Sequence, residues 1–317
     1  MGDVKGEGRS VASRIRATVF RIEFARRIVQ LICFLLFNAG IFGVSPLPIV
    51  LPVLQSLGSI HNTVGEAIGL MEWMLYRLEF PWIPLASVLI FAAVSGRLVC
   101  GWICPFGFVQ DLLRYAGVGK VRVSPKTHRY MTSMKYLALF LFIVVCGGLA
   151  VSSAIGVGQV YRETLGVVGE GPFTALSPSD TLFALTPRLI IVLQYSVFPI
   201  SEAYEIPVDL LSSPLLWARL TIMVGVLVLA LYVPRGWCRY FCPQGAMLAL
   251  VSRFSFLGLR RELVRCTRAS CRACVEACPM NIRILDQPWE KFTDPECIYC
   301  LRCVDACPSK AIRPTFP

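Results

Sequence analysis

Four long apolar stretches constrain the fold of this chain more than any other feature. They cover residues 28–44, 82–100, 136–155 and 215–233 of 317. A helix needs roughly 20 apolar residues to cross the hydrocarbon core of a bilayer. Only 16% of the residues are charged, whereas a soluble domain carries about 25%. The sequence therefore predicts an all-α integral membrane bundle of four transmembrane helices, and it excludes a soluble, disordered or fibrous chain.

Two further segments are too short or too polar to span a membrane. Residues 189–200 are apolar but are bounded by Pro187 and Pro199, so we expect them at the interface or packed on the bundle. Residues 60–80 mix charged and apolar side chains, which is typical of an amphipathic helix at a membrane surface.

The basic residues are sorted along the chain. Residues 1–27, the loop between the second and third spans, and the tail after residue 233 contain 26 of the 31 lysines and arginines. Because cytoplasmic loops carry such an excess, we expect a multi-pass protein of the cytoplasmic (inner) membrane with both termini inside. The net charge of +11 is then a topology signal, and nucleic-acid binding is not expected.

Eight of the 14 cysteines form two motifs near the C-terminus. The second motif has the C-x2-C-x2-C-x3-C-P spacing of bacterial ferredoxins, and the first also ends in C-x3-C-P. Zinc sites lack that final Cys-Pro, so the motifs predict two [4Fe–4S] clusters in a reducing compartment. The fourth cysteine of each motif is expected to ligate the other cluster. The expected ligand sets are Cys266, Cys271, Cys274 and Cys307, and Cys278, Cys297, Cys300 and Cys303.

The first of these motifs departs from the standard spacing. Four residues, rather than two, separate Cys266 from Cys271, which leaves the role of Cys266 open. Three regions follow from these patterns: a basic cytoplasmic arm over residues 1–27, a transmembrane domain over 28–257, and a small α+β dicluster-ferredoxin domain over 258–317.

Another cysteine motif, C-x3-C-P-x-G, occurs twice, where the second and fourth spans reach the cytoplasmic face. The repetition predicts two similar hairpins related as a parallel repeat. Cysteines four residues apart share one face of a helix, so each motif can offer two thiolates to one ligand. The four cysteines of the two copies are Cys100, Cys104, Cys238 and Cys242. We expect them to hold a third metal centre or cluster, or else to act as redox-active thiols.

Several cofactors are not expected. The only histidines, His61 and His128, fall on opposite sides of the predicted membrane, so no haem is expected inside the bundle. No glycine-rich dinucleotide motif or P-loop occurs in the sequence, which leaves NAD or ATP chemistry unsupported. Cys33 and Cys146 lie alone in predicted spans and are interpreted as small buried hydrophobic residues.

The combination of four spans, the duplicated C-x3-C-P motif and the two C-terminal motifs resembles the NapH-type membrane ferredoxins and their NosR, MauN and CcoG relatives. The resemblance covers roughly residues 26–313. It implies an electron-transfer subunit, quinol dehydrogenase-like, that relays electrons between quinone and an iron–sulfur or cytochrome partner. The outer loops are too short for a flavin-binding domain of the NosR type.

Residues that flank the duplicated motif are candidates for a quinone site, although Trp and Arg at such a boundary also serve as simple anchors. They are Arg97, Trp102, Gln110, Asp111, Arg235 and Trp237. Two alternative functions remain. One is an assembly or metal-handling factor whose C-x3-C-P cysteines bind a soft ion such as Cu(I), and the other is a zinc-stabilised membrane scaffold.

Overall fold

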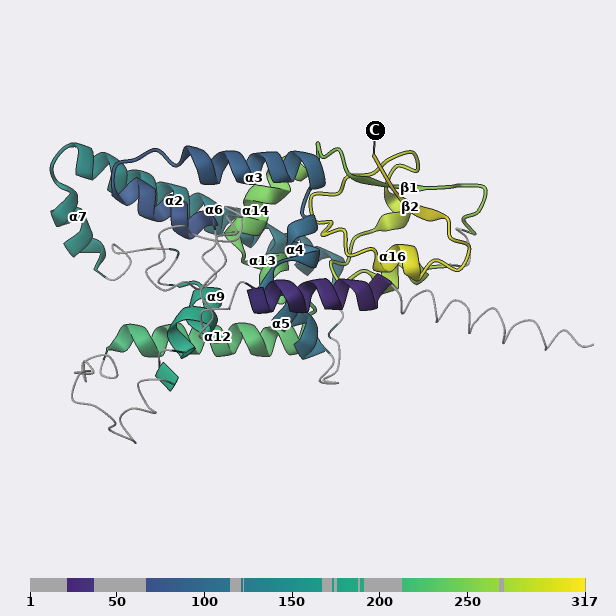
Figure 1. Cartoon of the computed structure of the whole chain (residues 1–317), viewed down its shortest axis with the longest axis horizontal. Helices are drawn as coiled ribbons and strands as arrows, with labels where there is room; N and C mark the ends of the chain where they lie inside the picture. Colours follow the sequence, from purple (N-terminus) through teal and green to yellow (C-terminus); the bar gives the residue numbers. More distant parts are fainter. Residues whose placement is uncertain are drawn as a thin grey trace, which may run out of the picture. The chain divides into compact units, whose positions relative to one another are not determined.

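The structure, a computed structural model, is built mainly from helices (Figure 1). It describes residues 22–36, 67–114, 121, 123–166, 173, 176–187, 189–190, 213–267 and 271–316. The chain forms two compact units, each assembled from separate segments. The first unit comprises residues 1–34, 89–111 and 247–317, and the second comprises residues 35–88 and 112–246.

The C-terminal segment of the first unit is a small α+β domain, as the sequence predicts. Strand β1 (Gly258–Arg261) pairs antiparallel with β2 (Ile312–Thr315), so that Arg260 lies opposite Arg313. Between the strands lie α15 (Ala273–Ala277), the short η4 (Ile284–Asp286) and α16 (Arg302–Asp305). Cys274 lies in α15 and Cys303 in α16, and the other cysteines of the domain lie in the loops between these elements. The apolar core beneath them includes Leu259, Ile298 and Ile312.

The rest of the first unit is helical. It contains a helix over residues 22–36, the end of α3 (Trp82–Ser95), α4 (Leu98–Trp102), most of α5 (Pro105–Leu113) and the end of α14 (Pro243–Ser252). The chain after α14 is joined to α3, since the N–H groups of Phe256 and Leu257 donate to the carbonyls of Ala93 and Val94 at 2.8 and 3.0 Å.

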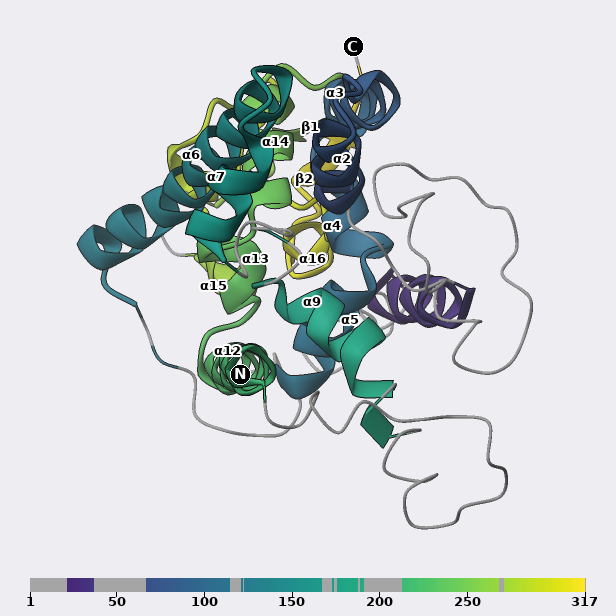
Figure 2. The same cartoon turned by 90° about the vertical axis from the view of Figure 1, so that its left-hand side faces the viewer.

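The second unit is organised around two long helices, α6 (Pro125–Ala154) and α12 (Pro214–Tyr232). Each begins with a Ser-Pro pair, in which proline occupies the first helical turn, where its missing N–H has no consequence. Helix α6 contacts α2 (Ala67–Tyr76), α7 (Gly158–Leu165) and α13 (Gly236–Tyr240), and Figure 2 shows α6 and α7 side by side. Helix α12 contacts α13, α9 (Pro178–Asp180) and the π-helix η3 (Thr181–Leu185).

Two helices of the described residues, Lys126–Ala154 and Pro214–Tyr232, are long and apolar enough to cross a membrane by length and composition. They coincide with the predicted third and fourth spans. Residues 28–36 of the first span belong to a helix over residues 22–36, and the remainder of the span lies outside the described residues, as do residues 191–200 of the short apolar segment. Within the segment 60–80, α2 is helical, and it packs against α6.

The prediction of one continuous helix over residues 82–100 is wrong. Helix α3 ends at Ser95 and α4 begins at Leu98. Gly96 separates them with a φ of +61°, a conformation that side chains disfavour. A Cβ at Gly96 would also lie 2.7 Å from the ring of Tyr299. The helix is therefore broken where the C-terminal domain packs closely against it.

Candidate metal centres

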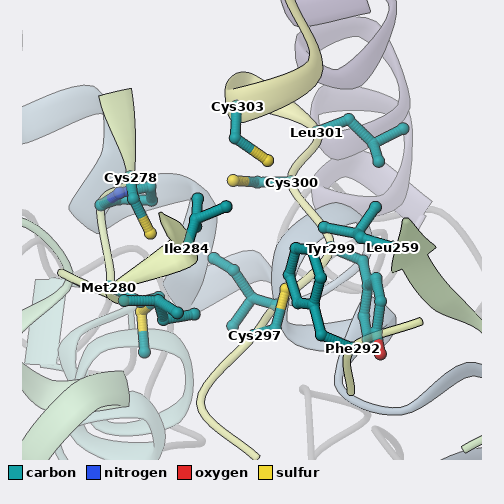
Figure 3. Close-up of a pocket in the computed structure, with 13 residues that line it drawn as sticks. Leu259, Cys278, Met280, Ile284, Phe292, Cys297, Tyr299, Cys300, Leu301 and Cys303 are labelled. Carbon is teal, nitrogen blue, oxygen red and sulfur yellow. The ribbon is translucent and has the colours of Figure 1, made fainter. Parts of the chain in front are cut away.

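Cys278, Cys297, Cys300 and Cys303 line one pocket of the C-terminal domain. Figure 3 shows their sulfur atoms directed toward this pocket, among apolar side chains such as Ile284 and Phe292. Cys278 comes from the first C-terminal motif and the other three from the second. The structure therefore brings together the four residues of one expected ligand set, taken from two separate motifs.

The environment of these thiols suits a cationic centre. Burial raises the pKa of Cys278 to about 12 and the pKa values of Cys297 and Cys303 well above the usual range. After burial, the charges of neighbouring thiols raise the same pKa values further. Four thiolates so close together and so dehydrated need a compensating positive charge, which the iron of a cluster supplies.

Backbone N–H groups point toward the sulfurs. Cys278 receives such hydrogen bonds from Met280 and Ile282, and Cys297 receives one from Tyr299. The loops reach this geometry through left-handed residues, which include Asn281 with φ +59° and Leu301 with φ +57°. Hydrogen bonds to sulfur stabilise the reduced state of an iron–sulfur cluster and so tune its potential.

The second expected ligand set is Cys266, Cys271, Cys274 and Cys307. Cys274 lies close enough to Cys266 and Cys307 that their charges raise the pKa of its thiol, after the larger effect of burial. The N–H of Ala311 donates to the Sγ of Cys307 at 3.3 Å. Three of these four cysteines are only partly buried, compared with two of the four in the first set. This set is therefore nearer to solvent than the first.

Within the described part of the chain, no three Cys, His, Asp or Glu side chains meet closely enough to hold a single metal ion. A [4Fe–4S] cluster does not require that, because each thiolate binds a different iron of a larger core. Two interleaved groups of buried or half-buried thiols, supplied with N–H donors, are compatible with two such clusters.

The first C-x3-C-P motif packs against the C-terminal domain. Cys100, in α4, contacts the apolar core that contains Cys300 and Cys303. A Cβ at the next residue, Gly101, would lie only 2.1 Å from the carbonyl oxygen of Ile298. Trp102 Nε1 donates to the carbonyl of Tyr299 at 2.9 Å. This junction joins the first repeated motif to the segment that carries Cys297 and Cys300.

Both copies of the repeated motif have the same backbone geometry. The N–H of Cys104 donates to the carbonyl of Val99 at 3.0 Å, and that of Cys242 donates to Trp237 at 3.0 Å. In each copy the helix ends before the second cysteine, and a new helix starts at Pro105 or Pro243. The expectation that both cysteines of a motif share one helical face is wrong, because a residue before proline is disfavoured in a helix.

The two copies belong to different units. Cys100 and Cys104 lie in the first unit, and Cys238 and Cys242 lie in the second. The meeting of all four thiols therefore stays a prediction. In the second copy, the neighbouring Tyr240 is buried and its hydroxyl lies 3.1 Å from Nδ1 of His128, which also accepts from Arg239 at 3.0 Å.

Three of the quinone-site candidates hold the first unit together. Arg97 is fully buried and donates to Glu296 at 2.9 Å, Trp102 binds the carbonyl of Tyr299, and Asp111 forms ion pairs with Arg26 and Arg27 at 3.3 and 3.2 Å. Gln110 and Arg235 are also fully buried, and Trp237 stacks on Phe241 with ring centroids 6.1 Å apart. A quinone site at these residues stays a prediction.

The sequence analysis did not identify the carboxylates that pair with Arg97 and Arg302. Glu296, next to Cys297, pairs with Arg97, and Glu23 pairs with Arg302, next to Cys303. The partners are 199 and 279 residues apart in the chain, so no local pattern could reveal them. Gly101 could have been noticed, because a glycine directly after the first cysteine of a motif suggests a close backbone contact. The sequence does not show, however, that this contact is with Ile298.

Comparison with known proteins supports these features. Residues 81–124 and 215–262 match the family described as a 4Fe-4S binding domain, and residues 261–312 match the 4Fe-4S dicluster domain. The first match contains both copies of the repeated motif, and the second contains both C-terminal motifs. The chain is thus an iron–sulfur protein with a dicluster ferredoxin domain.

Several curated proteins are similar along most of the chain. An uncharacterised protein of Methanocaldococcus jannaschii is 27% identical over 72% of this chain and 76% of its own length. Protein NirI of Paracoccus denitrificans is 27% identical over 76% of this chain but only 30% of its own length. Ferredoxin-type protein NapH of Escherichia coli is 22% identical over 84% of this chain and 74% of its own length.

The chain is thus similar along most of its length to 4Fe–4S ferredoxin proteins of the NapH and NosR type. It is an iron–sulfur protein of the electron-transfer type. No solved structure matches the chain.

Proposed function

We propose that this protein is a membrane-anchored electron-transfer subunit that relays electrons between the quinone pool and a partner oxidoreductase. Two [4Fe–4S] clusters of its C-terminal domain carry the electrons. One is held by Cys278, Cys297, Cys300 and Cys303, and the other by Cys266, Cys271, Cys274 and Cys307.

The observation that carries this proposal is the interleaving of the two C-terminal motifs. Cys278 lies with the thiols of the second motif, while Cys307 lies beside Cys274 of the first. This exchange of one cysteine is the arrangement of two-cluster ferredoxins. Two clusters held by the same short segment form a relay that can pass single electrons through the domain.

The proposed membrane anchor rests on α6 and α12, which have the length and composition of transmembrane helices. The proposed orientation, with the C-terminal domain in the cytoplasm, rests on the sorting of lysines and arginines along the sequence. Names such as ferredoxin-type and electron transport protein among the relatives favour a partner in an electron-transfer complex.

The first test is the iron content and redox response of the anaerobically purified protein. The two clusters of the C-terminal domain should contribute about 8 iron atoms per chain, and their absorption should bleach when a water-soluble quinol is added. Substantial copper together with clusters that quinol does not reduce would instead favour the metal-handling function. A protein with zinc and a featureless visible spectrum would contradict both.

The same measurement tests a third centre at the repeated motif. We propose that Cys100, Cys104, Cys238 and Cys242 together hold a further cluster, because their motif occurs in the two segments matched by one 4Fe-4S binding family. The iron content should then be about 12 per chain and fall to about 8 when all four are replaced by alanine. An equal iron content in both proteins would leave these thiols without a cluster.

A further inference from the structure

Three arginines converge on one glutamate at the end of the β1–β2 sheet. Nitrogens of Arg260, Arg265 and Arg313 lie 3.4, 3.0 and 3.7 Å from carboxylate oxygens of Glu262. The arginine side chains are 48–52% exposed, whereas that of Glu262 is 25% exposed. One carboxylate neutralises only one of three positive charges. This group, the arginine patch, therefore presents an excess positive charge to solvent.

Two exposed apolar side chains adjoin the arginine patch. Leu263 and Val264 follow Glu262 directly in the chain, and both side chains are exposed. Single exposed apolar residues are ordinary on protein surfaces. Arginines beside an apolar tip are, however, a typical composition for a protein–protein interface, where arginine is enriched and lysine and glutamate are depleted.

The arginine patch lies close to two proposed cluster ligands, Cys266 and Cys307. Cys266 follows Arg265 directly. The N–H of Glu262 donates to the carbonyl of Ala311 at 2.8 Å, and the N–H of Ala311 donates to the Sγ of Cys307 at 3.3 Å. Both cysteines are themselves only partly buried, and both belong to the ligand set nearer to solvent. The patch thus lies at the more exposed of the two proposed clusters.

We propose that the arginine patch is the docking surface for an acidic electron-transfer protein, which exchanges single electrons with the cluster of Cys266, Cys271, Cys274 and Cys307. The proposal rests on the proposed function, since it needs a cluster at that set. An excess of positive charge attracts a partner with surface Asp and Glu residues, so it accelerates the encounter and makes the rate fall with added salt.

The test uses the full chain, with its clusters reduced, in nanodiscs of neutral lipid and, for comparison, in nanodiscs that contain anionic lipid. Two oxidised acceptors are compared: plastocyanin, a small acidic blue-copper protein, and cytochrome c, a small basic haem protein. In each reaction one electron leaves a reduced cluster and reduces Cu(II) to Cu(I) or Fe(III) haem to Fe(II) haem. The second-order rate constants of the wild type, Arg260→Glu and Arg313→Glu are measured at low and high ionic strength.

We expect each variant to slow the reaction with plastocyanin about three- to tenfold at low salt, and to leave little difference at high salt. The reaction with cytochrome c should become faster. Arg283→Glu is the matched control, because it makes the same charge change at an exposed arginine of the same domain outside the patch. It should leave both rates nearly unchanged.

Equal effects of Arg260→Glu, Arg313→Glu and Arg283→Glu would overturn the proposal, since net charge alone would then set the rates. An effect of the patch variants that occurs only in nanodiscs with anionic lipid would also overturn it and would assign the patch to the lipid surface. The iron content distinguishes a failure of the proposed function from a failure of the proposed docking surface. A chain without iron contradicts the proposed function, whereas a full iron content with equal rates contradicts only the docking surface.

Discussion

Replacing Gly101 by alanine is expected to separate the first repeated motif from the C-terminal domain. The new Cβ would lie 2.1 Å from the carbonyl oxygen of Ile298 and 3.3 Å from its carbonyl carbon, so the backbone of one segment must move. An extra methyl group in a well-packed site typically lowers the free energy of unfolding by about 1–3 kcal/mol. We expect a loss near the upper end of that range, because the neighbouring atom belongs to the backbone and cannot rotate away.

The expected readout is the temperature at which the visible absorption of the clusters is lost. Gly101→Ala should lower it by several degrees, and Gly101→Val should lower it further. Gly225→Ala is a suitable control, because a Cβ at Gly225 in α12 meets no atom within 4 Å and alanine favours a helix. If Gly101→Ala behaves like this control, the close approach of Gly101 and Ile298 is absent from the protein in solution.

A smaller effect is expected at the neighbouring residue. Trp102→Phe keeps an aromatic side chain with a smaller ring and removes the hydrogen bond from Nε1 to the carbonyl of Tyr299. Loss of a part-buried hydrogen bond typically destabilises by about 1–2 kcal/mol. The temperature of cluster loss should fall by a few degrees, whereas Trp217→Phe, at a side chain 60% exposed, should change little. Equal shifts in both variants would show that ring size, and not the hydrogen bond, matters.

The C-terminal domain was largely predictable from the sequence because its chemistry is local. Cysteine spacing fixes which loop carries which thiol, and Cys-Pro marks the residue expected to reach the other cluster. The grouping of Cys278 with Cys297, Cys300 and Cys303 in one pocket agrees with that expectation. Cys266 lies close enough to Cys274 for its charge to raise the pKa of that thiol, and its role as a ligand stays a prediction.

The helical part was less predictable, because apolar length does not reveal where a helix breaks. The stretch over residues 82–100 is mostly apolar, with Arg97 near its end, yet the helix breaks at Gly96, where the ring of Tyr299 approaches closely. The residues after the repeated cysteines were misjudged for a local reason. Pro105 and Pro243 begin new helices, so the preceding helix ends before the second cysteine of each motif. The prediction used only the four-residue spacing of the cysteines and did not take the proline into account.

Long-range pairing was the least predictable feature. Arg97, Trp102 and Asp111 were selected as possible contacts of a quinone because they flank the motif. In the structure, these side chains bind Glu296, the carbonyl of Tyr299, and the arginines of the N-terminal helix. A buried arginine needs a carboxylate partner, but composition alone does not say which of the 20 acidic residues provides it.

Pairs of cysteine substitutions should reveal which thiols share a cluster, through the iron that remains. Cys278→Ala alone is expected to remove one cluster and leave about 4 of the 8 iron atoms of the C-terminal domain. Adding Cys300→Ala should remove no further iron, because both thiols line the same pocket. Adding Cys274→Ala instead should remove the second cluster as well, although Cys274 and Cys278 are neighbours in one motif.

This comparison is a double-mutant cycle in which the non-additive pair identifies the shared site. The measurement is iron and acid-labile sulfide per chain in anaerobically purified protein, with the four repeated-motif cysteines already replaced so that no third centre contributes. Cys33→Ala serves as the control and should retain all of the iron, since this cysteine lies in the helix over residues 22–36. If Cys274→Ala instead removes no further iron from the Cys278→Ala variant, these two cysteines bind the same cluster. Each motif would then hold its own cluster, and the exchange of one cysteine between the motifs would be wrong.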